Sequence, residues 1–146
     1  MSPREFLVIA KRLANEPTEA AWRTAVSRAY YSLFHQCRDQ LAVWGFVTRQ
    51  SDQAHLAISR RLFGSQLRPL VDAGHLLTDS KRVRNHADYE LQRPFHQIEV
   101  LRFVQAIESG AATAFQLNSD HQRLAVNNIK NYERDVLREV TWRSLN

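Results

Sequence analysis

The stretch WRTAVSRAYYSLFHQCRDQLAVWG, residues 22 to 45, decides the fold class of this chain. Its apolar side chains recur every three or four residues, which places them on one stripe of an α-helix. The stripe consists of Trp22, Val26, Ala29, Leu33, Cys37, Leu41 and Trp44. Gly45 follows directly and can end the helix in the left-handed conformation that glycine adopts without strain. We therefore expect a long amphipathic helix that packs against other helices.

Further segments carry the same helical spacing, and none shows the alternation of a half-buried strand. The other expected helices are residues 3–13, residues 52–63 with Asp52 as N-cap and Gly64 as the stop, residues 69–86, and a helix that Pro94 opens. The apolar stripes are Phe6, Ile9, Ala10 and Leu13 in the first of these helices and Leu101, Val104, Ile107, Ala111 and Phe115 in the last. The chain is therefore predicted to be all-α, with an antiparallel helical bundle over residues 1–118.

Residues 119–146 are predicted to form a C-terminal helical extension. Restart signals at Ser119 and Asp120 precede an amphipathic pattern, formed by Ile129, Tyr132, Val136, Leu137 and Val140. The stretch NNIKN in the middle of this pattern is a poor helix centre. Two arrangements stay open, because the extension could dock on its own bundle or bind a partner molecule.

Composition excludes several classes of protein. Of the 146 residues 44% are hydrophobic, yet no run approaches the roughly 20 apolar residues of a membrane span. The stretch MSPREFLVIAKRLANE has charges on both sides of a short apolar patch and does not resemble a signal peptide, so a cytoplasmic protein with no membrane partner is expected. The single Cys37 cannot form an internal disulfide and is expected to fill core space.

The net charge of +5 comes mostly from arginine, which favours phosphate-bearing partners. The positive balance belongs to the first two thirds of the chain. Within residues 59–68, the cations Arg60, Arg61 and Arg68 form either a phosphate-contact patch or a solvated helix face. No metal site and no cofactor are predicted, because the histidines lack carboxylate or cysteine partners at ligand spacing and no Gly-rich phosphate loop is present.

The candidate site lies in RVRNHADYE, residues 82 to 90. If this segment is helical, Arg82, His86 and Tyr89 share one face. A metal-free ribonuclease needs a base near neutral pKa and a cation beside the phosphate, and His86 and Arg82 have these properties. Alternatively, a histidine near a helix C-terminus serves stability alone. Arg84 and Asp88 share another face, with the spacing of an ordinary helix-surface ion pair.

Two separated motifs, SRAYYSLFHQCRDQL at residues 27–41 and RVRNHADYEL at residues 82–91, resemble the HEPN family of small helical domains over about residues 2–118. The resemblance implies an α-helical homodimer whose paired motifs line a cleft. Many such proteins are metal-independent ribonuclease toxins of toxin–antitoxin or anti-phage systems, and others bind RNA without cleaving it. The active members have an arginine, four to six residues and then a histidine. Here Arg82 lies too close to His86, and only Lys81 has the required interval.

The resemblance also implies roles for further residues. His35 corresponds to the histidine of the first motif and is expected across from the cluster. Tyr31 is either a base-stacking platform or a core residue. Lys81, Arg84, Asp88 and Tyr89 are expected to bind RNA or to support the site. A nucleotidyltransferase-type antitoxin would attach AMP to Tyr89.

The resulting prediction is a HEPN-like protein that acts on RNA, as a ribonuclease toxin with Arg82 and His86 as catalytic residues. Two alternatives stay open. One is a catalytically inactive module that binds nucleic acid or nucleotide, and the other is a protein-interaction module for an antitoxin or effector.

Overall fold

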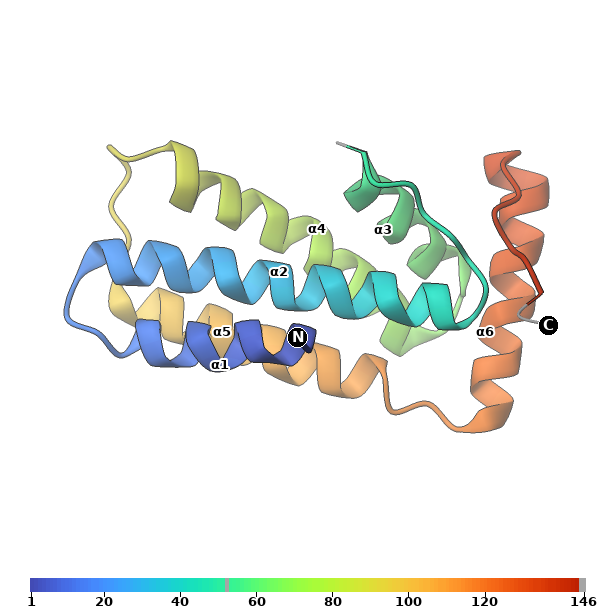
Figure 1. The fold of residues 1–146 in the computed structure, drawn as a ribbon, viewed down its shortest axis with the longest axis horizontal. Helices are drawn as coiled ribbons and strands as arrows, with labels where there is room; N and C mark the ends of the chain where they lie inside the picture. Colours follow the sequence, from blue (N-terminus) through green and yellow to red (C-terminus); the bar gives the residue numbers. More distant parts are fainter. Residues whose placement is uncertain (52, 145–146) are drawn as a thin grey trace.

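A computed structural model describes residues 1–51 and 53–144 and confirms the all-α prediction. The elements are α1 (Pro3–Ala14), α2 (Glu19–Val43), α3 (Ala54–Gly64), α4 (Arg68–Tyr89), α5 (Gln97–Ala114), α6 (Ser119–Tyr132) and the π-helical turn η1 (Glu133–Leu137). Helices α1, α2, α4 and α5 form an elongated bundle in which successive long helices run in opposite directions (Figure 1). The shorter α3 packs against α4 near one end of this bundle.

Helix α2 is the central helix of the bundle, as its stripe predicts. It packs against α1, α4 and α5. The middle of the predicted stripe is fully buried, namely Val26, Ala29, Leu33, Cys37 and Leu41, while Trp22 and Trp44 at its two ends are partly buried. Burial raises the pKa of the Cys37 thiol to about 12, which suits the predicted packing role.

Gly45 ends α2 in the predicted left-handed conformation, with φ of +98°. Its carbonyl accepts a hydrogen bond from the backbone N–H of Arg143 at 2.9 Å. A Cβ at this position would lie 2.6 Å from the Arg143 carbonyl oxygen, so glycine also makes room for the C-terminal segment.

The start of the fifth helix was predicted wrongly. Helix α5 begins at Gln97, three residues after Pro94, and His96 is still in extended conformation with φ of −109° and ψ of 139°. The guanidinium of Arg23 explains the difference, because it donates to backbone carbonyls in the last turn of α4 and in the segment that follows, and so holds that segment out of a helix. These carbonyls belong to His86, Ala87, Glu90, Leu91 and Arg93.

The predicted apolar stripes of α1 and α5 face the core, but some of the predicted residues are not fully buried. Ile9 is exposed, and Ala10 and Ala14 are the residues of α1 that are fully buried. Leu101 and Phe115 are only partly buried, whereas Val104, Ile107 and Ala111 are in the core as expected, together with Val100 and Ala114.

Helix α3 ends where Gly64 was expected to stop it, but for a different reason. Gly64 is helical, and the left-handed residue after the helix is Gln66, with φ of 57°. A Cβ at Gly64 would lie 2.5 Å from the ring of Tyr132, so glycine here permits α6 to approach. The predicted N-cap Asp52 lies outside the described residues.

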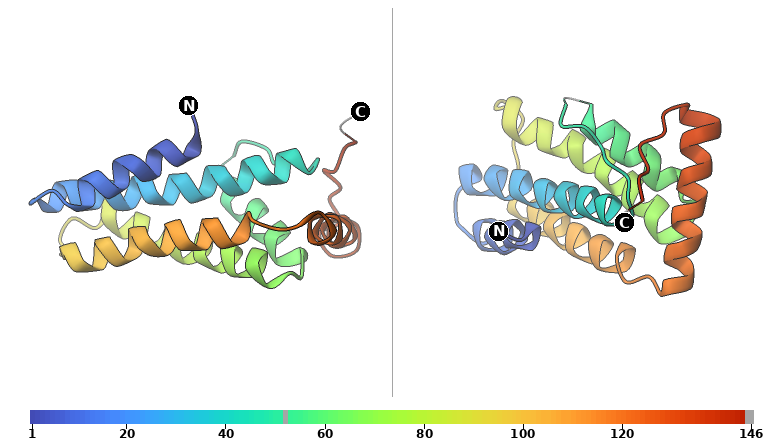
Figure 2. Two further views of the ribbon diagram at one scale, coloured as in Figure 1. Left: turned by 90° about the horizontal axis from the view of Figure 1, so that it is seen from below. Right: turned by 45° about the vertical axis from the view of Figure 1, so that its right-hand side comes forward.

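The C-terminal extension docks on its own chain. In the left view of Figure 2, α6 is seen end-on while the bundle helices lie lengthwise, so α6 crosses the end of the bundle beside α3. The helix continues through NNIKN because the side chains there have tertiary partners: Ile129 is buried, and Asn128 donates to the Ser65 carbonyl at 2.7 Å. The helix does not reach Val140 as the pattern suggested, since Arg138 is left-handed with φ of 55°.

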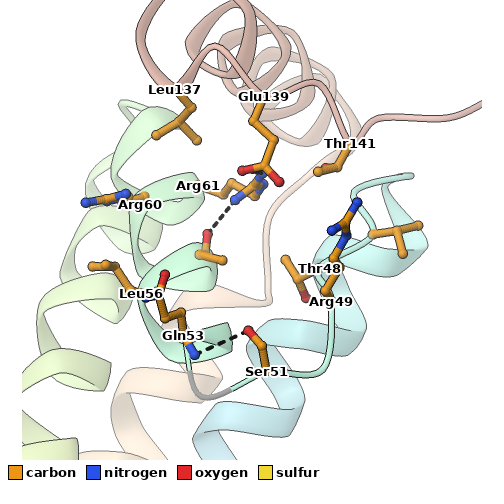
Figure 3. A pocket seen from close by; sticks show the side chains of 12 residues that line it. Thr48, Arg49, Ser51, Gln53, Leu56, Arg60, Arg61, Leu137, Glu139 and Thr141 are labelled. Carbon is orange, nitrogen blue, oxygen red and sulfur yellow. Dashed lines mark hydrogen bonds and ion pairs between the residues drawn. The ribbon is translucent and has the colours of Figure 1, made fainter.

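A buried ion pair fastens the C-terminal segment to α3. Arg61 Nε donates to Glu133 Oε1 at 2.8 Å, and the two side chains are 2% and 0% exposed. Arg61 also lines a polar pocket of about 170 Å³. In Figure 3, Glu139 points toward Arg61 from the C-terminal segment. The prediction for Arg61 was therefore wrong. Its side chain belongs neither to a phosphate-contact patch nor to a solvated helix face, because its charge is paired with Glu133 inside the fold. No helix among the described residues is long and apolar enough to span a membrane.

Candidate functional site

The antiparallel packing of α2 and α4 brings the two motifs together. Arg84 of α4 lies against the tyrosines of α2, with its guanidinium carbon 5.2 Å from the ring centroid of Tyr30 and 5.5 Å from that of Tyr31. Its side chain is 14% exposed. The predicted surface ion pair of Arg84 with Asp88 is therefore largely shielded on the arginine side, which corrects the expectation of an ordinary helix-surface pair.

Guanidinium groups and aromatic rings alternate across this face of the molecule. The Arg84 guanidinium carbon lies 6.0 Å from the Tyr89 ring, and that of Arg28 lies 5.4 Å from Tyr31 and 5.2 Å from Phe6. Together Tyr89, Arg84, Tyr31, Arg28 and Phe6 form what we call the arginine–aromatic seam. One residue of the seam comes from α1, two come from α2 and two come from α4.

Several buried polar atoms at the seam lack hydrogen-bond partners within residues 1–51 and 53–144. They are Nε of Arg28, Nε of Arg84, Nδ1 of His35 and, one turn before Arg84, Oγ of Ser80. A buried donor without a partner costs about 1–3 kcal/mol, and more when it is charged. Arg28 and Arg84 thus both have a buried Nε–H without a partner in the described chain, beside the ring of Tyr31.

Other contacts fix the seam in place. Asp88 occupies the far end of the Arg84 guanidinium, with 3.5 Å between Nη1 and Oδ2, and accepts a hydrogen bond from Ser27 Oγ at 3.4 Å. His35 stacks between Phe6 and Tyr31, with ring centroids 5.8 and 6.0 Å away. The Nε edge of Arg84 therefore stays without a partner while its Nη1 end is anchored.

An inner polar layer lies beneath the seam. Tyr30 Oη and His55 Nδ1 are 3.2 Å apart, and burial raises the pKa of Tyr30 to about 12. Burial, and then the charges of Lys81 and Arg84, lower the pKa of His55 to about 4. Lys81 thus contributes positive potential beside Arg84, and His55 is neutral at neutral pH.

This inner layer makes stability depend on pH. His55 has a pKa of about 4 in the fold against about 6.5 when unfolded, so its neutral form stabilises the protein above pH 6.5 and that contribution falls as the pH drops toward 4. We expect the free energy of unfolding to fall by about 2 kcal/mol between pH 6.5 and pH 5 from this residue.

Urea unfolding across this pH range measures the effect, with His55→Gln as the comparison. The variant should be less stable at pH 7 and should show a flatter pH dependence. Parallel curves for the wild type and the variant would contradict the assignment to His55. His121, which is exposed, is the matched control for the loss of a histidine.

The residues predicted to be catalytic lie on a different part of α4. Helix α4 continues to Tyr89, so the segment from Arg82 to Tyr89 is helical, which was the condition for the predicted shared face. The His86 side chain, however, points toward the segment after the helix. Its Nδ1 accepts from Arg93 Nη1 at 2.8 Å, and its Nε2 lies 3.3 Å from Glu90 Oε1. Both ring nitrogens are thus engaged within the chain. Arg82 is exposed, and Tyr89 lies beside Arg84 instead.

His86 also lines a cavity between α2, α4 and α5. The cavity has a volume of about 310 Å³, a floor of apolar residues and a charged rim. Its lining includes Val26, Val83, Phe95 and Phe103, with Arg93 and Glu99 at the rim. This cavity and the seam involve different residues of α4, so His86 is not part of the seam.

Three residues important for this region were not singled out from the sequence. Arg28 could have been found, because it stands three residues before Tyr31 and therefore shares its helix face. His55 and Arg23 gave no such signal, since their partners are far along the chain. In the described part of the chain, no three His, Cys, Asp or Glu side chains are placed to hold a metal ion.

Comparisons with family models, curated proteins and solved structures found no match to this chain.

Proposed function

We propose that the chain is a HEPN-like protein that binds RNA and that the arginine–aromatic seam contacts the RNA backbone. The observation that carries this proposal is the alternation of Arg28 and Arg84 with aromatic rings along the seam. Guanidinium groups bind phosphate oxygens through paired N–H donors.

The charge around the seam supports the same ligand class. Arg28 and Arg84 of the seam and the nearby Lys81 are positive, Asp88 pairs with Arg84, and the whole chain carries +5. A local excess of positive charge attracts phosphate and accounts for most sequence-independent affinity for nucleic acid. Aromatic rings between the cations add surfaces on which bases stack.

The contacts of His86 favour binding over cleavage. A general base must have a free nitrogen within reach of the 2′-hydroxyl, but Arg93 donates to Nδ1 and Glu90 lies beside Nε2. We therefore propose the non-cleaving alternative for this chain. The toxin role, the homodimer and the nucleotidyltransferase-type antitoxin stay predictions from the resemblance, which light scattering and intact-mass spectrometry can test.

Fluorescence anisotropy with a labelled 12-nucleotide RNA tests the proposal. We expect wild-type binding that weakens steeply with salt, and we expect Arg28→Gln and Arg84→Gln each to weaken it about tenfold. Arg68→Gln is the matched control, because Arg68 is an exposed arginine on α4 that pairs with Asp72. Thermal melts establish that each variant is folded.

Equal affinity of the wild type, Arg28→Gln and Arg84→Gln would refute the seam as the RNA site. A denaturing gel of the same mixtures separates binding from cleavage. We expect intact RNA. A product that disappears in Arg82→Ala and His86→Ala would instead support the ribonuclease prediction.

A further inference from the structure

We propose that the polar pocket between α3 and the C-terminal segment binds a dianionic phosphate, either free phosphate or the phosphate group of a small phosphomonoester. The pocket has a volume of about 170 Å³. It shares no residue with the arginine–aromatic seam, so the inference does not depend on the proposed function.

The pocket is rich in arginine. Three arginines line it, namely Arg49 from the loop after α2, and Arg60 and Arg61 from α3. In the view of Figure 3, Arg49 and Arg60 stand on either side of Arg61. The carboxylates of Glu133 and Glu139 lie beside Arg61, and of these Glu139 lines the pocket.

Two of these arginines are free to meet a ligand. The charge of Arg61 is matched by the buried Glu133. Arg49 and Arg60 are exposed and form no ion pair within residues 1–51 and 53–144. They therefore supply two positive charges at the pocket, which match the two negative charges of a phosphate dianion.

Glu139 occupies the pocket without being held there firmly. Its side chain is 64% exposed, and its Oε2 lies 4.0 Å from Arg61 Nη2, too far for a hydrogen bond. Within the described residues Nη2 donates no hydrogen bond, whereas Nε donates to Glu133 and Nη1 to the Ala57 carbonyl. A weakly held carboxylate thus stands where an anion would bind, and an anion with more charge displaces it at little cost.

The size and the hydroxyl groups of the pocket fit a phosphate group. Cavities that hold drug-sized ligands measure about 300–1,000 Å³, so a cavity of about 170 Å³ suits a smaller group. Thr48 and Ser51 also line it and carry hydroxyl groups that can donate to oxygen. A phosphate monoester has three terminal oxygens to accept from guanidinium and hydroxyl donors, whereas a carboxylate has two.

Isothermal titration calorimetry at constant ionic strength tests the proposal with three ligands. Inorganic phosphate and glycerol phosphate represent the two sources of the dianion, and dimethyl phosphate represents the singly charged diester of a nucleic-acid backbone. The variants are Arg49→Gln, Arg60→Gln and Glu139→Gln, all of exposed residues, with Arg68→Gln on α4 as the matched control. Arg61 is left in place, because its loss would unpair the buried Glu133. Thermal melts establish that each variant is folded.

We expect saturable binding of inorganic phosphate and glycerol phosphate, and about tenfold weaker binding of dimethyl phosphate because it has a single charge. Arg49→Gln and Arg60→Gln should each weaken phosphate binding about tenfold, since each removes a charged donor. Glu139→Gln should strengthen it about threefold by removing the competing carboxylate. Arg68→Gln should bind as the wild type does.

Four outcomes would overturn the inference. They are no saturable binding of phosphate, wild-type affinity in both Arg49→Gln and Arg60→Gln, weaker binding in Glu139→Gln, or a diester that binds as tightly as the monoester. The last result would make the pocket a contact for a nucleic-acid backbone instead. None of these outcomes bears on the seam, whose RNA binding is measured with Arg28→Gln and Arg84→Gln.

Discussion

Replacing Glu133 with alanine is expected to lower the free energy of unfolding by about 3–5 kcal/mol, because it leaves the buried Arg61 charge without its partner. Glu133 also accepts hydrogen bonds from the backbone N–H groups of Thr141 and Trp142, at 2.8 and 3.2 Å, and from the Thr141 hydroxyl. One carboxylate thus holds the C-terminal segment to α3. Urea unfolding at pH 7 measures the loss.

Glu139→Ala is the matched control for this effect. Glu139 Oε2 also faces Arg61, at 4.0 Å from Nη2, but its side chain is 64% exposed, so its loss should cost under about 0.5 kcal/mol. The double variant Arg61→Met with Glu133→Leu should recover part of the stability, since no buried charge remains unpaired while the N–H groups of Thr141 and Trp142 still lose their acceptor. Similar small losses for Glu133→Ala and Glu139→Ala would contradict the buried pair.

Replacing Arg23 with alanine is expected to lower the free energy of unfolding by about 3 kcal/mol, because several backbone carbonyls would lose a charged donor. The Arg23 side chain is only 11% exposed and also bonds Glu19 Oε1, with 2.8 Å from Nε. It lies over the Phe95 ring, 4.9 Å from the centroid. Arg23→Lys should recover little, because an ammonium cannot reproduce the planar fork.

Arg68→Ala controls for the loss of an arginine and its pair four residues away. Arg68 is exposed and pairs with the exposed Asp72, so its loss should cost under about 0.5 kcal/mol. Hydrogen exchange adds a local readout, since Arg23→Ala should release the segment between α4 and α5. Full stability in Arg23→Lys would show that charge alone suffices and would contradict the account of the fork.

The parts of the fold that follow from local pattern were predictable. The stripe of α2 and the left-handed Gly45 depend on neighbouring residues, so the sequence contained the information. The start of α5 depends on Arg23, which is far away in the chain, and local signals at Pro94 misplaced it. Helix α6 runs through NNIKN because of a tertiary hydrogen bond to Ser65, which local propensity cannot reveal.

In the candidate site, too, the contacts within one helix were predictable and the contacts between helices were not. Helical register correctly placed Arg84 and Asp88 together as an ion pair. Register could not reveal that Arg84 packs under two tyrosines of another helix, or that His86 turns to Arg93. The roles of these residues toward RNA stay proposals, because they concern a ligand rather than the fold.

The most direct test of the RNA site observes the arginine Nε–H groups by NMR during titration with a single-stranded 12-nucleotide RNA. Arg28→Lys and Arg84→Lys assign the two seam resonances by deleting them one at a time. Arg61 is the internal control, because its Nε already donates to Glu133. We predict saturable shifts for Arg28 and Arg84 and no change for Arg61. RNA binding that leaves the Arg28 and Arg84 resonances unmoved would contradict the account.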